Sequence, residues 1–542
     1  MNDTLRMPER WDYLILTASN DLQAAAYETQ VQWRVEAGHL ARVREALVVA
    51  DIGGKRIGSG GSTLQCLNVV LERERRRGRR DEPAEEVFRR LRILIVHAGG
   101  DSRRLPAYGP CGKIFVPLPG ESYSALGSTI FDRLVPLFLD LPPGLPGAGQ
   151  VVIAAGDALN RFDAQAVRLD YRGMTALGCY AAPEEAARHG VFCLGEDHSV
   201  RLFLQKPSLE EQAELGAISR FGKTPLDIGV MSFDAAAAAA LMEAFGGDLW
   251  PLAVDLGVDF YREICCAMGA EATLERYVRS ARGSGSKWSG EQLALVFPKL
   301  RKIPFRARLA PRCHFLHFGS TRQLVASGLA LLAQDMGTPP VVTTISVNNQ
   351  VEGDGAVAGS DSWVEGCRLR APLLLAGRNV VVGVDVNEQL ALPRGGCLEV
   401  VKGRSRAGAS GWFVRCYSVD DTFKDAASKG GTFCGTAAAD WMGKAGVRTE
   451  DLWETTIPPE ERTLWNARVF PFEASPDGFQ RWLWMFDPAR ASAAQKQEFL
   501  KADRYSAAEV AWLADQEDFH LRRAAIRAWE LRSNLQRLFS RE

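Results

Sequence analysis

Apolar runs alternate with helical patterns from residue 12 to about residue 300 of the chain. Each run ends in a turn rich in glycine, serine or aspartate, and the strands expected on this pattern are residues 12–18, 46–51, 92–97 and 150–155. Alternating strands and helices indicate parallel pairing and a sheet covered on both faces. The pattern predicts a doubly wound α/β domain over residues 1–310, with its ligand beyond the carboxyl ends of the strands.

The spacing of apolar residues changes between residues 345 and 381. Apolar side chains recur there every six residues, with glycines between them, at Ile345, Val351, Val357, Trp363, Leu369, Leu375 and Val381. This period is typical of the hexapeptide repeat, in which each short strand of a parallel β-helix points one side chain inward. An irregular β-sandwich with accidental spacing is the alternative. We predict a parallel β-helix domain over residues 311–430, with residues 398–418 added as a hairpin.

The last segment, residues 431–542, is rich in tryptophan and charged residues. Its final part, residues 506–539, has apolar residues at helical spacing, which predicts a helical C-terminal region. A chain of 542 residues is too long for one hydrophobic core, so several domains agree with its length. The predicted fold class is therefore α/β: a Rossmann-like domain, then a parallel β-helix, then a helical segment.

Composition and charge exclude several classes of function. The chain has 65 Lys and Arg against 66 Asp and Glu, so its net charge of -1 creates no general attraction for nucleic acid or anionic membrane. No apolar run is long enough to span a bilayer, and the N-terminal residues lack the pattern of a secretory signal. The 11 cysteines form no CxxC pair, which indicates reduced thiols. We expect a cytoplasmic protein whose phosphate binding is local.

The most informative stretch for chemistry is residues 93–119. A buried strand leads into Gly99 and Gly100, which let backbone N–H groups approach a phosphate chain, and Arg103, Arg104 and Lys113 add positive charge. The expected nucleotide-binding residues here are Ala98, Gly99, Gly100 and Ser102. The spacing matches neither a P-loop nor a GxGxxG fingerprint. It resembles the AGGxGxRLxxxxxK signature of sugar-phosphate nucleotidyltransferases, which implies a nucleoside triphosphate as ligand.

Further motifs of the same family follow in order. Gly156 and Asp157 end a predicted strand, where a carboxylate can hold Mg²⁺ against a triphosphate. Residues 189–207 resemble the motif G-V-x-x-F-x-E-K-P, with Gln205 in place of Glu and Lys206 as the residue expected to meet the sugar phosphate. Residues 226–233 resemble the sugar-recognition strand N-x-G-I-Y/M-x-F, in which Asp227 replaces Asn. The resemblance implies that Asp227 and Gly229 bind the sugar.

A narrower resemblance covers nearly the whole chain. It rests on TASND (17–21), GSGGST (58–63), HAGGDSRRLP (97–106), FLHFGST (315–321), YSVDDTFK (417–424) and FCGT (433–436) followed by Trp441. Together these resemble the L-fucose-1-phosphate guanylyltransferase family, which includes the N-terminal half of a bifunctional fucokinase/guanylyltransferase. The resemblance implies a left-handed β-helix and the reaction of GTP with β-L-fucose 1-phosphate to GDP-L-fucose and pyrophosphate. It also implies that His317 lies near the sugar.

The interval between Lys113 and Asp157 is short for this fold. It has room for a helix and one strand, where the general family has a further strand and helix. We infer that the N-terminal units fill the missing sheet position, which would bring a serine- and glycine-rich turn close to the nucleotide. The residues of that turn are Ser59, Gly60, Gly61 and Ser62. The alternative is a plain strand-to-helix turn with Ser62 or Thr63 as N-cap.

The expected mechanism needs no general base, because a phosphate with a second pKa of about 6 is largely dianionic at neutral pH. Asp157 and a second carboxylate, Asp255 or Asp259 on one helix face, would hold Mg²⁺, although helix-surface charges explain that pair almost as well. Lys113 with Arg103 or Arg104 would stabilise the negative charge that develops on pyrophosphate, and Lys206 would hold the attacking phosphate.

The expected partners are GTP and a sugar 1-phosphate, without nucleic acid or membrane, and the β-helix would be the surface for any oligomer. Two alternatives stay open: a nucleotidyltransferase for another sugar or cyclitol 1-phosphate, and a non-catalytic scaffold that has kept the fold. A zinc site at Cys313, His314 and His317 is not expected, because alternate strand residues point in opposite directions. No kinase activity is expected.

Overall fold

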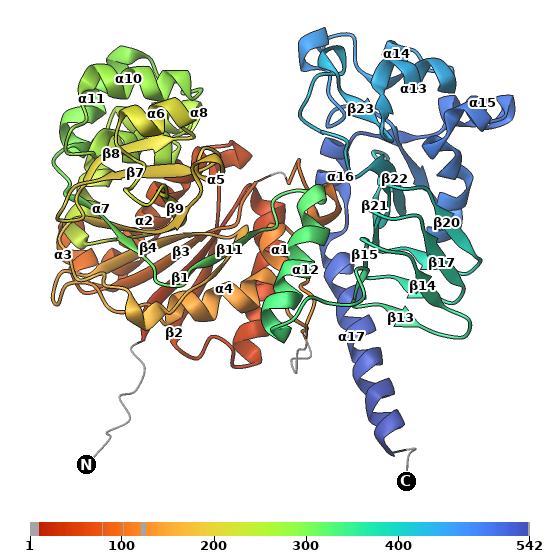
Figure 1. Ribbon diagram of the computed structural model, residues 1–542, viewed down its shortest axis with the longest axis horizontal. Coiled ribbons are helices and arrows are strands. Elements are labelled where there is room, and N and C mark those ends of the chain that lie inside the picture. The colour runs from red at the N-terminus through yellow and green to blue at the C-terminus, as the bar shows by residue number, and fades with distance from the viewer. Residues whose placement is uncertain (1–9, 79, 101, 121–125, 540–542) are drawn as a thin grey trace. The chain divides into compact units, whose positions relative to one another are not determined.

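The computed structural model describes residues 10–78, 80–100, 102–120 and 126–539 (Figure 1). The chain forms two compact units: residues 1–100 with 133–315, and residues 101–132 with 316–542. The predicted boundary at residue 310 lies close to the change of unit after residue 315. Two parts of the predicted division are corrected. Residues 101–132 belong to the second unit, and residues 431–542 share that unit with the predicted β-helix.

The first unit is built on a mixed β-sheet. Its strands, in sheet order, are β10 (Phe305–Leu309), β6 (Met174–Ala181), β9 (Thr224–Phe233), β4 (Gln150–Ala155), β3 (Arg92–His97), β1 (Trp11–Ala18) and β2 (Val43–Ala50). The strands from β4 to β2 are parallel, and β9 is antiparallel to both β4 and β6. A hairpin of β7 (Gly190–Leu194) and β8 (Val200–Gln205) extends from β9. The N-terminal strands thus fill sheet positions beside β3, as predicted.

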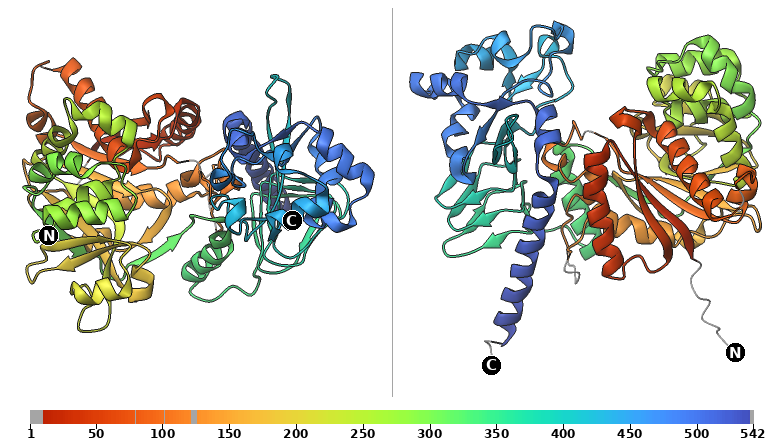
Figure 2. Two further views of the ribbon diagram at one scale, coloured as in Figure 1. Left: turned by 90° about the horizontal axis from the view of Figure 1, so that it is seen from above. Right: turned by 180° about the vertical axis from the view of Figure 1, so that it is seen from behind.

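Both faces of this sheet are covered, which explains its nearly continuous apolar strands. Tyr13 and Ile15 of β1 belong to a core formed with helices on one face, while Leu14 and Leu16 are buried on the other. The helices of that core are α2 (Gly58–Arg77), α3 (Ala84–Arg89), α7 (Ala235–Phe245), α10 (Leu274–Gly283), α11 (Gly290–Leu300) and the π-helix Phe260–Cys265. Helix α1 (Asp21–Glu36) lies on the opposite face (Figure 2).

Shorter elements complete the first unit and its connection to the second. They are α4 (Ile130–Leu139), α5 (Pro183–Ala186), α6 (Leu209–Glu214), α8 (Leu249–Leu256), α9 (Cys266–Met268), β5 (Ala158–Arg161) and β11 (His314–His317). The N-cap of α6, Ser208, forms a reciprocal capping box with Glu211, as does Ser289 with Gln292 at α11. These caps accept hydrogen bonds from N–H groups that have no intrahelical partner in the first turn. Short helices therefore begin directly after a serine that can cap them.

The second unit contains a coil of short parallel strands. Within residues 345–404 the strands stack into three parallel sheets, β12-β15-β18-β21, β13-β16-β19 and β14-β17-β20 (Figure 1). Their bounds are β12 Ile345–Val347, β13 Gln350–Val351, β14 Ala356–Ala358, β15 Trp363–Glu365, β16 Arg368–Leu369, β17 Pro372–Leu375, β18 Val380–Val382, β19 Asp385–Val386, β20 Leu390–Leu392 and β21 Gly396–Arg404. This arrangement agrees with the predicted hexapeptide pattern and not with a β-sandwich.

The register of the coil corrects part of the predicted six-residue pattern. Ile345 pairs with Trp363 and Trp363 with Val380, so the first coil has 18 residues and the second has 17. The shorter coil moves Val381 opposite Val364. A Cβ at Gly328 of α12 (Thr321–Met336) would lie 2.5 Å from Ile345 Cδ1 and 3.0 Å from Trp363 Cζ3. Ile345 and Trp363 therefore face that helix, while Val364 and Val381 face the coil interior.

Burial along the other two sides follows the position of each coil in the stack. Leu369 is fully buried, and so is Leu373, which is the register partner of Val357. Val351 lies in the first coil, where a neighbouring coil covers only one side of it, and it is 41% exposed. The prediction that Val351 is buried is therefore wrong, because a repeat at the end of a stack lacks one neighbour.

Antiparallel strands extend the coil toward the C-terminus. Strand β22 (Ser410–Ser418) pairs with β21 as the predicted hairpin, and β25 (Phe470–Glu473) and β26 (Arg504–Tyr505) continue the same sheet. The remaining elements are β23 (Thr432–Phe433), β24 (Thr436–Ala437), α13 (Ala438–Ala445), α14 (Thr449–Leu452), α15 (Ala493–Lys501), α16 (Ala507–Leu513) and α17 (Gln516–Phe539). The C-terminal region is thus mixed α/β, which corrects the helical prediction.

Substituting Leu369 with Asp should lower the free energy of unfolding by several kcal/mol, because the carboxylate would be buried without a partner. The matched control is Leu374→Asp, since Leu374 lies in the same coil but is 37% exposed. Thermal unfolding of the two variants tests the assignment of interior positions. Equal losses of Tm would contradict it.

Candidate functional site

The loop after β3 is held by side chains that follow β1. The N–H groups of Ala98 and Gly99 donate to Thr17 Oγ1 at 3.1 and 3.3 Å, and the N–H of Gly100 donates to Ser19 Oγ at 2.5 Å. The motif TASND therefore supports the glycine loop directly. This contact places the N-terminal motif and the predicted nucleotide loop at the same edge of the sheet, where the strands of a doubly wound fold present their ligand.

The glycines at the start of α2 have a packing role. The N–H groups of Gly60 and Gly61 donate to the carbonyl of Val258 at 2.7 and 3.0 Å. A Cβ at Gly60 would lie 2.8 Å from Val258 Cγ1, and one at Gly58 would lie 2.4 Å from the Val258 carbonyl oxygen. These amides are committed to the protein's own backbone, so the geometry lends no support to their predicted contact with a nucleotide.

The neighbouring serines are likewise used inside the protein. Ser59 Oγ accepts from the N–H of Phe260 at 2.9 Å, and Ser62 Oγ donates to Asp51 Oδ1 at 2.6 Å. Burial raises the pKa of Asp51 from 3.8 to about 6. Helix α2 begins at Gly58, so the alternative in which Ser62 or Thr63 is the N-cap is also wrong.

Three acidic side chains of the first unit lie close enough to Tyr261 to raise the pKa of its phenol. Burial raises the pKa of the Tyr261 phenol well above its usual value, and the negative charges of Asp227, Asp259 and Asp157 add to this effect. Asp157 follows β4, Asp227 lies in β9, and Asp259 precedes the π-helix. A Cβ at Gly229 would lie 3.6 Å from the Tyr261 hydroxyl oxygen. The structure thus brings together three predicted site residues from separate motifs, with Gly229 beside them.

Asp227 is the most perturbed of these carboxylates. Its side chain is only 7% exposed, and Oδ1 has no hydrogen-bond partner among the described residues. Burial raises its pKa from 3.8 to about 7, while a hydrogen bond from the N–H of Gly229 acts in the opposite direction. A buried oxygen without a partner is costly for folding, which is typical of a group that meets a ligand.

Asp255 and Asp259 do not lie on one helix face, contrary to prediction. Helix α8 ends at Leu256, and Gly257 turns the chain with a φ of +76°. Asp255 is exposed and forms an ion pair with Lys55 at 2.6 Å. Asp259 caps the π-helix, where its Oδ1 accepts from two backbone N–H groups. Asp259 is therefore the better candidate for the second carboxylate.

Lys206 lies at the rim of a polar cavity of about 530 Å³ in the first unit. Its φ of +53° is uncommon for a residue other than glycine, and its side chain is exposed. The same cavity is lined by Arg276 and Arg279 of α10 and by Glu211 of α6. The structure therefore places the predicted phosphate-binding lysine in a cavity that also contains arginines, for which the motifs provided no signal.

The remaining predicted residues belong to the second unit. Ser102 is buried with a φ of +52°, and the Arg103 guanidinium lies 5.4 Å from the centre of the Trp465 ring. The carbonyl of Arg104 accepts from the N–H at the start of α12 at 2.8 Å. Lys113 begins a short 3₁₀ helix, and the His317 carbonyl accepts from a serine of α12 at 2.8 Å. Their predicted functional roles stay predictions.

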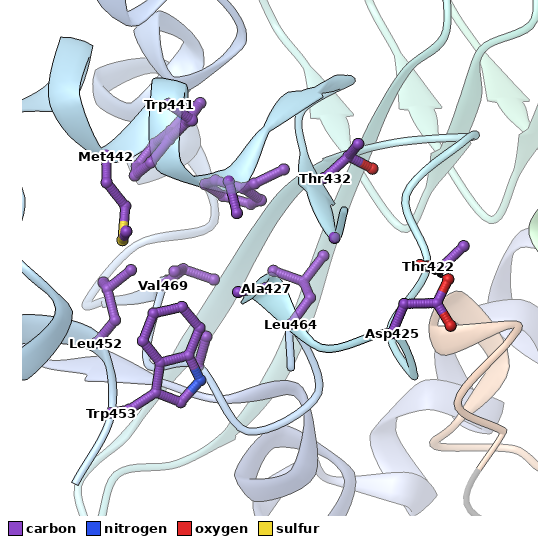
Figure 3. Close-up of a pocket in the computed structure, with 14 residues that line it drawn as sticks. Thr422, Asp425, Ala427, Thr432, Trp441, Met442, Leu452, Trp453, Leu464 and Val469 are labelled. Atoms are coloured by element: carbon purple, nitrogen blue, oxygen red, sulfur yellow. Dashed lines mark hydrogen bonds between the residues drawn. The ribbon is translucent and has the colours of Figure 1, made fainter. Parts of the chain in front are cut away.

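An apolar cavity in the second unit is lined by aromatic and aliphatic side chains (Figure 3). Trp441, Trp453 and Leu464 are among them, and Asp425 is on the lining as well. Its volume of about 20 Å³ is close to that of one water molecule. It is too small for a nucleotide or a sugar, so it forms part of the core and not of the site.

Two further results concern the described residues only. Within them, no helix combines the length and apolar character that a membrane span requires. Likewise, no three His, Cys, Asp or Glu side chains in the described ranges lie together as a ligand set for a metal ion. Mg²⁺ is usually held by one or two carboxylates together with substrate phosphates.

Substituting Asp227 with Asn should increase stability at pH 8 and change it little at pH 4.5. Because its pKa is raised from 3.8 to about 7, the folded protein binds more protons than the unfolded chain in this window, and stability falls as pH rises through it. With about 1.4 kcal/mol for each pKa unit, the gain at pH 8 is at most about 4 kcal/mol.

The gain can be measured by denaturant unfolding at both pH values. Asp255→Asn is the control, because Asp255 lies in an exposed ion pair. A similar response of both variants to pH would show that the buried state of Asp227 is wrongly assigned.

Comparison with known proteins places the chain in a family. A family model described as the fucose pyrophosphorylase domain matches residues 85–475. Over 526 residues the chain is 26% identical to a bifunctional fucokinase/GDP-fucose pyrophosphorylase of Arabidopsis thaliana, covering 86% of this chain and 48% of that protein. It is 23% identical over 523 residues to a fucose-1-phosphate guanylyltransferase of Mus musculus, covering 85% of this chain and 84% of that protein.

The chain thus spans about half the length of the bifunctional relative. Among solved structures, a mannose-1-phosphate geranyltransferase from Thermus thermophilus is 15% identical, with coverage of 76% of this chain and 96% of that one and a TM-score of 0.25. That likeness is too low to support an argument. The match to the family model covers well over half of the residues, and on this evidence the chain belongs to the fucose pyrophosphorylase family.

Proposed function

We propose that this chain transfers GMP from GTP to β-L-fucose 1-phosphate, giving GDP-L-fucose and pyrophosphate. The observation that carries the proposal is the family match over residues 85–475, within which the predicted site residues Asp157, Asp227 and Asp259 all lie near Tyr261. The names of the relatives support fucose 1-phosphate as the sugar substrate. They include a guanylyltransferase, which supports GTP as the nucleotide.

The reaction is a single displacement at phosphorus. A phosphate oxygen of the sugar 1-phosphate forms a bond to the α-phosphorus of GTP, and the bond from that phosphorus to the oxygen bridging to the β-phosphorus breaks, so that pyrophosphate leaves with the electron pair. The attacking phosphate is already ionised at neutral pH and needs no base. The contribution of the protein is therefore to position the substrates and to offset negative charge.

The residues present fit a Mg²⁺ ion. Asp157 follows β4 at the carboxyl edge of the sheet, and Asp259 uses Oδ1 to cap the π-helix, which leaves Oδ2 for another ligand. We assign Asp157 and Asp259 to hold the ion, a set of one or two carboxylates that Mg²⁺ prefers. When bound, the ion would offset the negative charge of the triphosphate oxygens. Lys206, at the rim of its cavity, would orient the sugar phosphate.

Four further features belong to the same proposal. The coil of parallel strands would be left-handed, as the resemblance implies, and the protein would act in the cytoplasm without nucleic acid or membrane. Any oligomer would form through the coil. Lys113 with Arg103 or Arg104 would neutralise pyrophosphate.

The proposal is tested by a pyrophosphate-release assay of the four nucleoside triphosphates with a panel of sugar 1-phosphates, in the presence of Mg²⁺. GTP with fucose 1-phosphate should be the best pair. Asp157→Asn should lower kcat by at least about a hundredfold while the protein stays folded, because it removes a charge from the metal site.

Asp255→Asn is the matched control and should keep near-normal turnover, since that side chain forms a surface ion pair. Activity with another sugar phosphate only would redirect the substrate assignment. Normal turnover of Asp157→Asn would move the metal site elsewhere.

The two lysines should have separable effects. Lys206→Ala should mainly raise KM for the sugar phosphate, whereas Lys113→Ala should weaken nucleotide binding and slow pyrophosphate departure. Each loss should be about 3 kcal/mol if the contact is charge-assisted and shielded from water. Steady-state kinetics with each substrate varied in turn would measure this, and equal effects of both substitutions on both substrates would contradict the assignment.

A further inference from the structure

Two polar atoms beside β9 have no hydrogen-bond partner within the part of the chain that the structure describes. One is Oδ1 of Asp227, which is buried. The other is the hydroxyl of Tyr261, whose residue makes hydrogen bonds there only through its backbone, with Asp259 and Cys266. The Tyr261 side chain is half-buried, so its hydroxyl is not sealed inside the core. An acceptor and a hydroxyl that both lack a partner and lie near each other indicate a binding site for a ligand with hydroxyl groups.

The positions of these two groups are tightly set. The Tyr261 ring stacks on Phe203 with centroids 6.2 Å apart and an angle of 16° between the planes. A Cβ at Gly190 would lie 2.4 Å from Phe203 Cζ and 3.4 Å from Asp227 Cβ, so Phe203 and Asp227 both pack closely against Gly190. Gly229 has a φ of +75°, and a Cβ there would lie 2.9 Å from the Cβ of Ala155.

Packing alone does not require the Tyr261 hydroxyl. The ring is held by Phe203, and a phenylalanine would make the same stack. Tyr277 is the contrasting case: its hydroxyl donates to the Glu263 carbonyl at 2.7 Å and is fully used inside the protein. The free hydroxyl of Tyr261 therefore points to recognition of something outside the chain.

The surrounding charge limits what that ligand can be. Asp227, which the proposed Mg²⁺ site does not use, disfavours an anionic group beside the hydroxyl of Tyr261. A neutral ring with hydroxyl groups can donate to Asp227 Oδ1 and also exchange a hydrogen bond with the phenol. The sugar ring of the substrate has this chemistry, whereas its phosphate does not.

We propose that Tyr261, together with Asp227 Oδ1, binds hydroxyl groups of the substrate's sugar ring and that Tyr261 thereby selects among sugar 1-phosphates. This inference rests on the proposed function, which it deepens by naming a specificity-determining residue. A site built to hydrogen-bond a hydroxyl discriminates strongly against analogues that lack it, because its own polar groups are then left unpaired.

The experiment compares Tyr261→Phe with Tyr13→Phe in this chain, because the buried Tyr13 hydroxyl donates to Glu74 Oε1 at 2.6 Å. Tyr261→Phe should raise KM for fucose 1-phosphate about tenfold, with kcat and KM for GTP changed less than about twofold. Tyr13→Phe should lower Tm, because it removes a buried hydrogen bond to Glu74 Oε1, and leave KM for fucose 1-phosphate unchanged.

Monodeoxy analogues of fucose 1-phosphate identify the contact. With the wild type, one analogue should have a much higher KM than fucose 1-phosphate. Tyr261→Phe should raise the KM of that analogue little further, because the missing sugar hydroxyl and the Tyr261 hydroxyl form one hydrogen bond. Equal losses for every analogue in both proteins would overturn the inference. A rise in KM for GTP, in place of that for the sugar phosphate, would also overturn it and assign Tyr261 to the nucleotide.

Failure of the proposed function gives a different result. Wild-type protein that turns over another sugar 1-phosphate, but not fucose 1-phosphate, contradicts the proposed substrate, and the comparison is then made with the sugar phosphate that is turned over. An unchanged KM in Tyr261→Phe for that substrate overturns the inference alone. Wild-type protein that turns over no sugar phosphate contradicts both.

Discussion

The geometry of the candidate site depends on the segment Gly257–Cys265, which distant parts of the first unit hold in place. The carbonyl of Val258 accepts from two N–H groups at the start of α2, and the N–H of Phe260 donates to Ser59, which lies 201 residues earlier. On the other side, the Trp288 indole donates to the Gly257 carbonyl at 2.7 Å. This anchoring fixes the positions of Asp259 and Tyr261, because a segment that is hydrogen-bonded on both sides leaves its side chains few possible positions.

A second constraint holds residues 102–120 to the second unit. The Tyr108 hydroxyl accepts from the Trp363 indole at 2.7 Å and lies 3.3 Å from Glu365 Oε2, which also accepts from Arg523 at 2.6 Å. These groups are buried, and each would be costly without its partners. These buried hydrogen bonds explain why residues 102–120 pack with residues more than 200 positions later, although the glycine motif that they continue begins in the first unit.

The candidate site shows how glycines and carboxylates serve different ends in one fold. At Gly60 and Gly190 a Cβ would collide with protein atoms, so these glycines permit close packing that sets the site's shape. Asp227 instead lowers the free energy of unfolding, because its buried oxygen has no hydrogen-bond partner until a ligand provides one. Stability and recognition are thus in tension at this strand, as expected for a binding site.

Local patterns in the sequence determined the strands at residues 12–18, 46–51, 92–97 and 150–155, the N-terminal strands beside β3, the hairpin at β21 and β22, and a coil with about six residues per side. These features repeat within a few residues, so spacing alone reveals them. The motifs also indicated the family and placed Asp157 and Asp227 at strand positions. Only the tertiary structure decided the 17-residue second coil, which puts Val381 on the opposite face from Trp363, the packing role of Gly60 and Gly61, and the choice of Asp259 over Asp255. It alone brought Tyr261 to Asp227, because that meeting depends on contacts between residues far apart in the chain, which no local period or motif encodes.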